Sequence, residues 1–107
     1  MTPRLRQAPL APAVLDEAAT MIRVLGHPVR LRIVEALEHG ERTVTYLQEQ
    51  LGAPQAIVSQ QLSKMKAGGL LRCRREGTSV WYAVADDRVL RVLDCLRTCD
   101  LPAKRGR

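Results

Sequence analysis

Apolar residues recur three and four positions apart over most of this chain, and this spacing is typical of helices with one buried face. It runs through residues 13–25, 28–39, 44–50, 54–66 and, after two aspartates, 86–99. Glycine and proline separate these stretches at Gly26, Pro28, Gly40, Gly52, Pro54, Gly68 and Gly69. The pattern therefore predicts a mainly helical fold of about five helices around one aliphatic core.

Residues 70–84 follow a different pattern, because β-prone residues replace the helical spacing there. Two such runs, 70–75 and 80–84, flank the sequence Glu-Gly-Thr-Ser, whose glycine suits a tight turn. We therefore predict a small two-stranded hairpin with arginines close to its tip. An isolated hairpin is only marginally stable, so we expect this one to pack on the helices. The apolar side chains available for that contact are those of Leu71, Val80, Tyr82 and Val84.

Residues 44–66 predict two helices joined by a tight turn at Gly52, since glycine readily adopts the left-handed backbone conformation of a sharp turn. Pro54 suits the first position of the second helix. The predicted apolar face of that helix is formed by Ile57, Val58, Leu62 and Met65. The opposite face carries the small or amide side chains of Ala56, Ser59, Gln60 and Ser63. No acidic residue occurs from position 50 through 75.

We interpret residues 54–66 as a reading helix, meaning a helix that contacts base edges in the DNA major groove. Serine and glutamine can pair with base edges, and basic side chains can reach phosphates. The candidate DNA-binding residues are Gln55, Ser59, Gln60, Ser63, Lys64 and Lys66 on this helix, and Arg72, Arg74 and Arg75 on the hairpin. The alternative is an ordinary amphipathic helix beside a solvated charged hairpin. A plain surface helix usually includes glutamate, so its absence here favours DNA binding.

Charge and length support this interpretation. The 107-residue chain has a formal net charge of +6 and a pI near 9.9, which favours an anionic partner: nucleic acid first, a membrane surface second. Residues 54–79 contain five Lys or Arg and one Glu, a net +4. No apolar run approaches the roughly 20 residues of a membrane span. The N-terminus lacks the apolar core of a signal peptide, so we expect a cytoplasmic protein with no membrane partner.

The chain divides into one domain and two short basic ends. Residues 1–12 contain three prolines and two arginines, which predicts a disordered arm that either makes no contact or touches the DNA backbone. Residues 13–101 form the predicted DNA-binding and dimerisation domain, and 102–107 a disordered tail. The chain is long enough to form the core of one small domain, but not to form a deep enzyme cleft as well.

The last predicted helix is unusually apolar for the edge of a small domain. Its stripe occupies more than half of the circumference and consists of Val89, Leu90, Val92, Leu93 and Leu96. Asp86 and Asp87 precede the helix, where carboxylates favour the positive end of the helix dipole. We expect the stripe to be buried against a second copy of the chain as well as against its own core. The alternative is a protein-interaction module that holds a different protein on this face.

An enzyme is the least supported class. No cysteine stands near a histidine in a recognisable catalytic pattern, and no glycine loop that could cradle a phosphate is present. His27 falls in a loop and His39 near a helix end, and nothing pairs them at metal-binding spacing. We therefore interpret both as capping or surface histidines.

In its order of elements and in three motifs, the chain resembles the ArsR/SmtB family of winged helix-turn-helix repressors. The motifs are LGHPVRLRIVEAL at 25–37, LGAPQAIVSQQLSKMKAGGLL at 51–71 and RREGTSVWYAV at 74–84. The resemblance implies a homodimer built from the first and last helices. It also implies binding to an imperfect inverted repeat in double-stranded promoter DNA, with half-sites about 34–36 Å apart, and release by a small inducer.

Three departures from the family patterns concern the inducer. Thr43 and Thr45 stand where arsenic and cadmium sensors of the family often carry Cys-x-Cys, so that site should be absent. The last helix has no histidine for the zinc or nickel site of another branch. The persulfide-responsive branch resembles this chain through PQAIVSQQL and RREG, but Glu35 occupies the position of its second-helix cysteine.

Cys95 and Cys99 lie one helical turn apart, on the same side of the last predicted helix. Two thiolates so placed can bind a soft metal or metalloid, such as arsenite, cadmium or zinc, or can react with sulfur species and oxidants. A third ligand would come from Cys73 on the hairpin, from the other subunit or from water. The alternative is that the cysteines are structural, since free cysteine often behaves as a small buried hydrophobe. The repressor would then respond to another signal.

Overall fold

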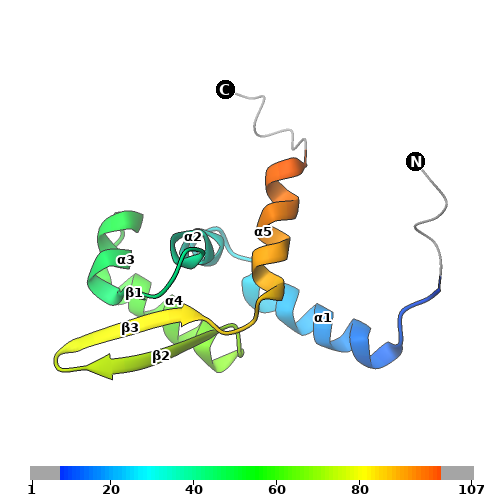
Figure 1. Ribbon diagram of the computed structural model, residues 1–107, viewed down its shortest axis with the longest axis horizontal. Helices are drawn as coiled ribbons and strands as arrows, with labels where there is room; N and C mark the ends of the chain where they lie inside the picture. Colours follow the sequence, from blue (N-terminus) through cyan, green and yellow to red (C-terminus); the bar gives the residue numbers. More distant parts are fainter. Residues whose placement is uncertain (1–7, 100–107) are drawn as a thin grey trace.

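The computed structural model describes residues 8–99, which form five helices and one three-stranded sheet (Figure 1). The helices are α1 (Pro12–Leu25), α2 (Pro28–Leu37), α3 (Val44–Leu51), α4 (Gln55–Ala67) and α5 (Arg88–Thr98). The strands are β1 (Arg42–Thr43), β2 (Leu71–Glu76) and β3 (Ser79–Val84), in the order β1-β3-β2 with antiparallel pairing. The predicted arm and tail fall mostly or wholly outside the described residues.

Short polar interactions fix the ends of the helices near the predicted positions. The Nδ1 of His27 accepts a hydrogen bond from the backbone N–H of Val29 at 3.1 Å, which caps α2 and confirms the capping role of this histidine. Thr43 caps α3 in the same way, because its Oγ1 accepts from the N–H of Tyr46 at 3.0 Å. Gly52 then ends α3 at φ 61°, the predicted left-handed conformation.

Several predicted boundaries need correction. The sheet has three strands rather than two, because Arg42 and Thr43 pair with Tyr82 and Trp81 on the outer side of β3. A strand of two residues is too short to show an alternating pattern, so β1 could not be predicted from its residues. The helix α2 ends at Leu37, two residues before the predicted end. Pro54 is the N-cap of α4 rather than its first helical residue.

The helix α4 contributes the centre of the core. Val58, Leu62 and Met65 are completely buried, as predicted, against a cluster that includes Ile33 and Leu47. Ile57 was predicted on the same face but is 41% exposed, whereas Gln61 is 8% exposed. At 3.6 residues per turn, Ile57 lies about 105° from the centre of the stripe formed by Val58, Leu62 and Met65, and Gln61 only about 65° from it. Position on the helix therefore outweighs the polarity of these two side chains.

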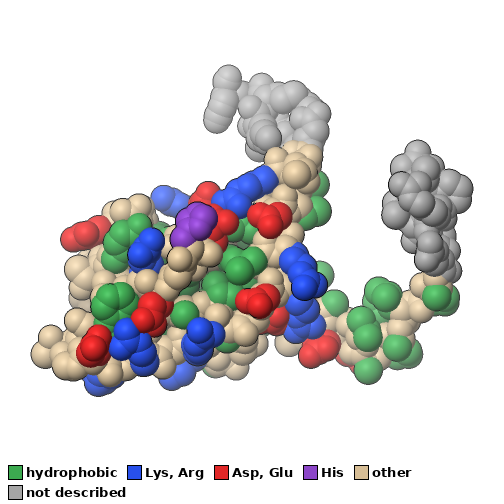
Figure 2. Space-filling view, in the orientation of Figure 1, with side chains coloured by type: hydrophobic (Ala, Val, Ile, Leu, Met, Phe, Trp, Pro, Cys, Tyr) green, Lys and Arg blue, Asp and Glu red, His purple; other side chains and the backbone are tan. Residues whose placement is uncertain are grey.

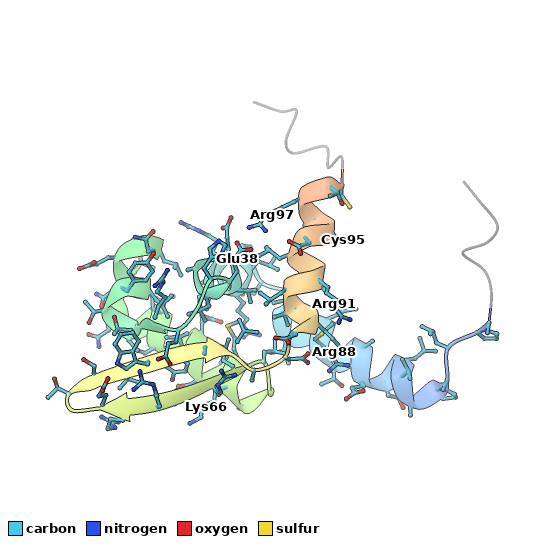
Figure 3. The ribbon with its side chains drawn as sticks, in the orientation of Figure 1. Glu38, Lys66, Arg88, Arg91, Cys95 and Arg97 are labelled. Atoms are coloured by element: carbon cyan, nitrogen blue, oxygen red, sulfur yellow. The ribbon has the colours of Figure 1, made fainter. Side chains whose placement is uncertain are left out.

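The helix α1 extends away from the rest of the molecule, and α5 stands beside its inner end, on the side opposite the tip of the hairpin (Figure 1). Within α1 only Met21 and Leu25 are buried. Hydrophobic side chains therefore remain on its surface, and Figure 2 shows them gathered along the outer part of the helix. Ion pairs tie the two helices to each other and to α2: Arg88 to Glu17 at 3.5 Å, and Arg97 to Glu38. The side chains of Arg97 and Glu38 point toward one another in Figure 3.

One matched pair of variants tests this assignment of the core. We expect Ile33→Ala to lower the free energy of unfolding by about 2–5 kcal/mol, because Ile33 is fully buried and its removal leaves a cavity. The same truncation at exposed Ile57 should cost less than about 1 kcal/mol. Urea unfolding followed by circular dichroism measures both. Equal losses for the two variants would contradict the burial of Ile33 and the exposure of Ile57.

Candidate nucleic-acid interface

A groove of about 710 Å³ runs between α3, α4 and the β2–β3 hairpin. Its lining is largely polar and basic, and includes Thr43, Thr45, Gln48, Gln55, Ser59, Ser63, Lys66, Cys73, Arg75, Thr78, Ser79 and Tyr82. Four of the predicted DNA-binding residues of α4 and one of the hairpin therefore meet on a single concave surface. The surface is wide and open rather than an enclosed cavity.

The outward side of α4 has the predicted exposure. Gln55, Gln60 and Ser63 are exposed and Ser59 is half-buried, so none of these polar side chains is used inside the subunit. Lys64 and Lys66 lie in the last turn, where cations favour the negative end of the helix dipole. Gln60 and Lys64 lie outside the groove lining, on the neighbouring exposed side of the helix. Together these residues form a continuous acid-free surface on α4.

The three hairpin arginines do not share one environment. Side chains alternate between the two faces of a strand, so Arg75 points to the groove while Arg72 and Arg74 point away from it. Arg72 lies opposite Ala83, at the base of the hairpin rather than near its tip, and its Nη1 donates to the carbonyl of Val84 at 2.8 Å. The prediction that all three arginines lie near the tip is therefore wrong for Arg72, which sits five pairs from the turn along the ladder.

Arg74 holds the hairpin against the loop before β1. Its Nε and Nη2 donate to the carboxylate of Glu41 at 3.1 and 2.6 Å, and its guanidinium lies 5.2 Å from the centre of the Trp81 ring. The hydrogen bond from Arg74 lowers the pKa of Glu41, and the same bond raises the pKa of Arg74. Arg74 is thus largely neutralised by its partner. Arg75 has no ion-pair partner within residues 8–99 and offers its charge to the groove.

Cys73 and Tyr82 face each other across the sheet at the inner wall of the groove. Burial raises the pKa of Tyr82, nearby Cys73 raises it further, and Lys66 lowers it in part. Cys73 is half-buried and packs against the core, as a structural cysteine would. Within residues 8–99, no group of three His, Cys, Asp or Glu residues could hold a metal ion, so Cys73 does not complete a site with the α5 cysteines of its own chain.

The α5 cysteines lie on the other side of the molecule. Cys95 is exposed, one turn after Arg91 on the same helix (Figure 3). Cys99 is half-buried and forms the C-cap, with its N–H donating to the carbonyl of Cys95 at 3.0 Å. This bond keeps the two cysteines one turn apart even though the helix ends at Thr98, one residue before the predicted end. Asp87 caps the start of α5 without a side-chain bond, and Asp86 instead accepts from the N–H of Arg88 at 3.0 Å.

One polar residue inside the domain was missed by the sequence interpretation. Among residues 8–99, Gln61 is the only polar residue whose side chain is buried in the core. Its Oε1 accepts a hydrogen bond from the Nε of Arg30 at 2.7 Å. The available signal was an amide on the apolar side of a helix otherwise lined by Val58, Leu62 and Met65. An amide there needs a buried partner.

Known proteins with similar sequences and structures are transcriptional regulators. A family model described as a helix-turn-helix domain matches residues 25–74. The HTH-type transcriptional repressor SmtB of Mycobacterium tuberculosis is 36% identical over 95 residues, which cover 84% of this chain and 70% of that protein. The crystal structure of the transcriptional repressor BigR from Xylella fastidiosa is 30% identical, with a TM-score of 0.75, and the match covers 81% of this chain and 91% of that one.

A third relative is a homodimeric winged helix-turn-helix DNA-binding domain from Mycobacterium bovis, described as a possible ArsR-family transcriptional regulator. Its solution structure is 32% identical, with a TM-score of 0.69, and the match covers 85% of this chain and 87% of that one. In this fold the β2–β3 hairpin is the wing, and α3 and α4 are the helix-turn-helix.

The fold and the groove beside α4 define a winged helix-turn-helix DNA-binding protein, which is a regulator of transcription and not an enzyme. The chain belongs to the ArsR/SmtB family of repressors, as its sequence motifs predicted. Among the helices of residues 8–99, none has both the length and the apolar character needed to cross a membrane.

Proposed function

We propose that this chain is a homodimeric repressor that binds an imperfect inverted repeat in promoter DNA and is released by an inducer acting on the thiols of α5. The observation that carries the proposal is the exposed, acid-free side of α4, formed by Gln55, Ser59, Gln60 and Ser63 beside Lys64 and Lys66. In this arrangement α4 enters the major groove. Arg75 and the tip of the wing contact the adjacent phosphates or minor groove, and Arg72 adds positive potential behind them. Arg74, paired with Glu41, holds the wing in place.

A symmetric pair built on α1 and α5 accounts for the apolar surface at the other side of the protomer. Val14, Leu15 and Ile22 of α1 are 48%, 51% and 59% exposed. Leu90, Val92 and Leu96 of α5 are half-buried, although their helix lies at the edge of the domain. Exposed apolar side chains gathered along one helix favour a protein–protein interface. The homodimeric state of the M. bovis relative supports a second copy as the occupant.

For the inducer we propose soft metal or metalloid binding, or reaction with sulfur species or oxidants, at Cys95 and Cys99. Cys95 is exposed, and the pair lies on the helix that borders the proposed dimer interface. Arsenite, cadmium or zinc bound there would draw its remaining ligands from the second subunit or from water. Glu35 lies on the exposed surface between α2 and α3, so the two-helix cysteine pair of the persulfide-responsive branch is incomplete in this chain.

Selection from a library of random duplexes tests the DNA-binding part of the proposal. We expect the purified protein to enrich an inverted repeat and to bind the enriched duplex at least about 1,000-fold more tightly than a scrambled one at physiological salt. Affinity should fall steeply as salt rises, because the protein displaces counterions from the phosphates. Equal binding to the enriched and scrambled duplexes would contradict a sequence-specific repressor.

A second set of variants tests the thiols. Cys95→Ser and Cys99→Ser should bind the enriched duplex as wild type does but no longer be released by the effective inducer. Cys73→Ser is the control and should keep the response. Mass spectrometry of the intact protein after exposure to arsenite, cadmium or polysulfide identifies the chemistry from the mass gained. If both single variants still release DNA with every species tried, the cysteines are structural and another signal acts on the repressor.

A further inference from the structure

We infer that a half-buried bridge from Arg30 to Gln61 and to the carbonyl of Val24 fixes the angle between α1 and α4 and thereby sets the spacing of the two half-sites that a dimer can bind. The inference rests on the proposed function, because it needs a dimer joined through α1 that reads DNA with α4. It assigns a positioning role to two residues that contact neither the DNA nor the second subunit in the proposed arrangement.

The bridge joins three helices through one side chain. Arg30 of α2 donates from Nε to Oε1 of Gln61, in the middle of α4, at 2.7 Å. Its Nη1 donates to the carbonyl of Val24, near the end of α1, at 2.6 Å. The last carbonyls of a helix have no partner within the helix, and a cation there also favours the negative end of the helix dipole. The planar guanidinium holds both acceptors in fixed directions, which a lysine could not do.

A second contact to α1 also involves Val24. A Cβ atom built on Gly68, at the end of α4, would lie only 2.9 Å from both methyl groups of Val24. The end of α4 therefore touches the side chain of Val24 while Arg30 holds its carbonyl. Beyond these points α1 extends away from the domain, with Met21 and Leu25 as its only buried residues (Figure 1). Few contacts thus define the direction of α1, and the bridge is the one that joins it to both α2 and α4.

The direction of α1 matters because the second copy sits on it. A change in the angle between α1 and α4 moves the two reading helices of a dimer relative to each other. On DNA, one additional base pair between half-sites moves them apart by about 3.4 Å and rotates one relative to the other by about 35°. A dimer with a fixed angle therefore fits one spacing, and one with a loose angle tolerates several.

Two variants separate positioning from stability. In the double variant Arg30→Met/Gln61→Met, apolar side chains of similar length replace both side chains of the bridge. The carbonyl of Val24 then also loses its Arg30 donor, so the free energy of unfolding of this variant is measured alongside its binding. Gln61→Met alone is a second test, since the half-buried Arg30 can then bind water. Gln61→Glu keeps the acceptor and should preserve the bridge. Arg32→Met removes the same charge from an exposed position of α2 and is the matched control.

The experiment measures binding to the duplex that wild type enriches, and to versions whose half-sites are one base pair closer or farther apart. Wild type, Gln61→Glu and Arg32→Met should prefer the original spacing by at least about tenfold. The double variant and Gln61→Met should prefer it by less than about threefold, with affinity for a duplex of one half-site unchanged. Sedimentation of each protein confirms the dimer.

The outcomes separate the two proposals. If wild type is a dimer with a preferred spacing and both bridge variants keep that preference, the positioning role of Arg30 and Gln61 is wrong and the repressor proposal stands. If wild type enriches no spaced repeat or is not a dimer, the repressor proposal fails and the inference fails with it.

Discussion

Replacing Ile22 by glutamate should convert the protein from a dimer to a monomer and weaken binding to an inverted repeat by at least about 100-fold. Ile22 is 59% exposed in the protomer, so the variant has no reason to misfold. In a dimer built on α1, however, the new carboxylate would be buried without a partner in an apolar interface, which is strongly unfavourable. A monomer reads one half-site and loses the gain in affinity that comes from linking two binding modules.

Analytical ultracentrifugation and a gel-shift assay on the same samples measure both effects. Gln50→Glu introduces the same change of charge at an exposed position of α3, away from the proposed interface, and should change neither. A dimer that survives Ile22→Glu would show that the second copy sits elsewhere. A wild-type monomer that binds a different protein through α1 would instead support the interaction-module alternative.

Replacing Gln60 or Ser59 by alanine should reduce discrimination between the enriched and scrambled duplexes by about 5- to 150-fold, the value of a well-formed contact to a base edge. Both side chains lie on the outward side of α4 and neither forms part of the core. Affinity for scrambled DNA should be unchanged, because non-specific binding depends on the phosphates. Gln50→Ala removes an amide from an exposed position of α3 and is the control.

Loss of a basic side chain should instead lower the affinity for DNA without changing the discrimination between sequences. Arg75→Ala or Lys64→Ala should weaken binding to every duplex alike and reduce the slope of log affinity against log salt by about 1. Competition binding at several salt concentrations separates the two classes. A Gln60 variant that loses affinity equally for all sequences would show that this residue does not read bases.

The parts of the fold that follow from local rules were predictable from the sequence. The helical spacing of Val58, Leu62 and Met65 predicted the buried side of α4, and the turn at Gly52 followed from the conformational freedom of glycine. The polar side of the same helix then lay opposite the buried one. Its acid-free composition, together with the resemblance of three motifs to a known family, predicted the class of protein. These inferences work because periodicity and turn chemistry depend on residues that are close in sequence.

The rest depends on contacts between residues far apart in the chain. Nothing near Gln61 in the sequence indicates that Arg30 will satisfy its amide, and nothing near Glu41 indicates that Arg74 will bind it. The direction of each hairpin arginine depends on the register between β2 and β3, which the sequence leaves open. The strand β1 forms because Arg42 and Thr43 pair with β3, which is distant in the sequence.

Methylation protection of guanine N7 shows whether two copies of α4 enter successive major grooves of one duplex, because N7 faces the major groove. We expect this double entry to give two protected segments of the enriched duplex, related by twofold symmetry and centred about one helical turn apart, both lost in Ile22→Glu at concentrations that saturate wild type. Protection of a single segment, or of none while the protein is bound, would contradict it.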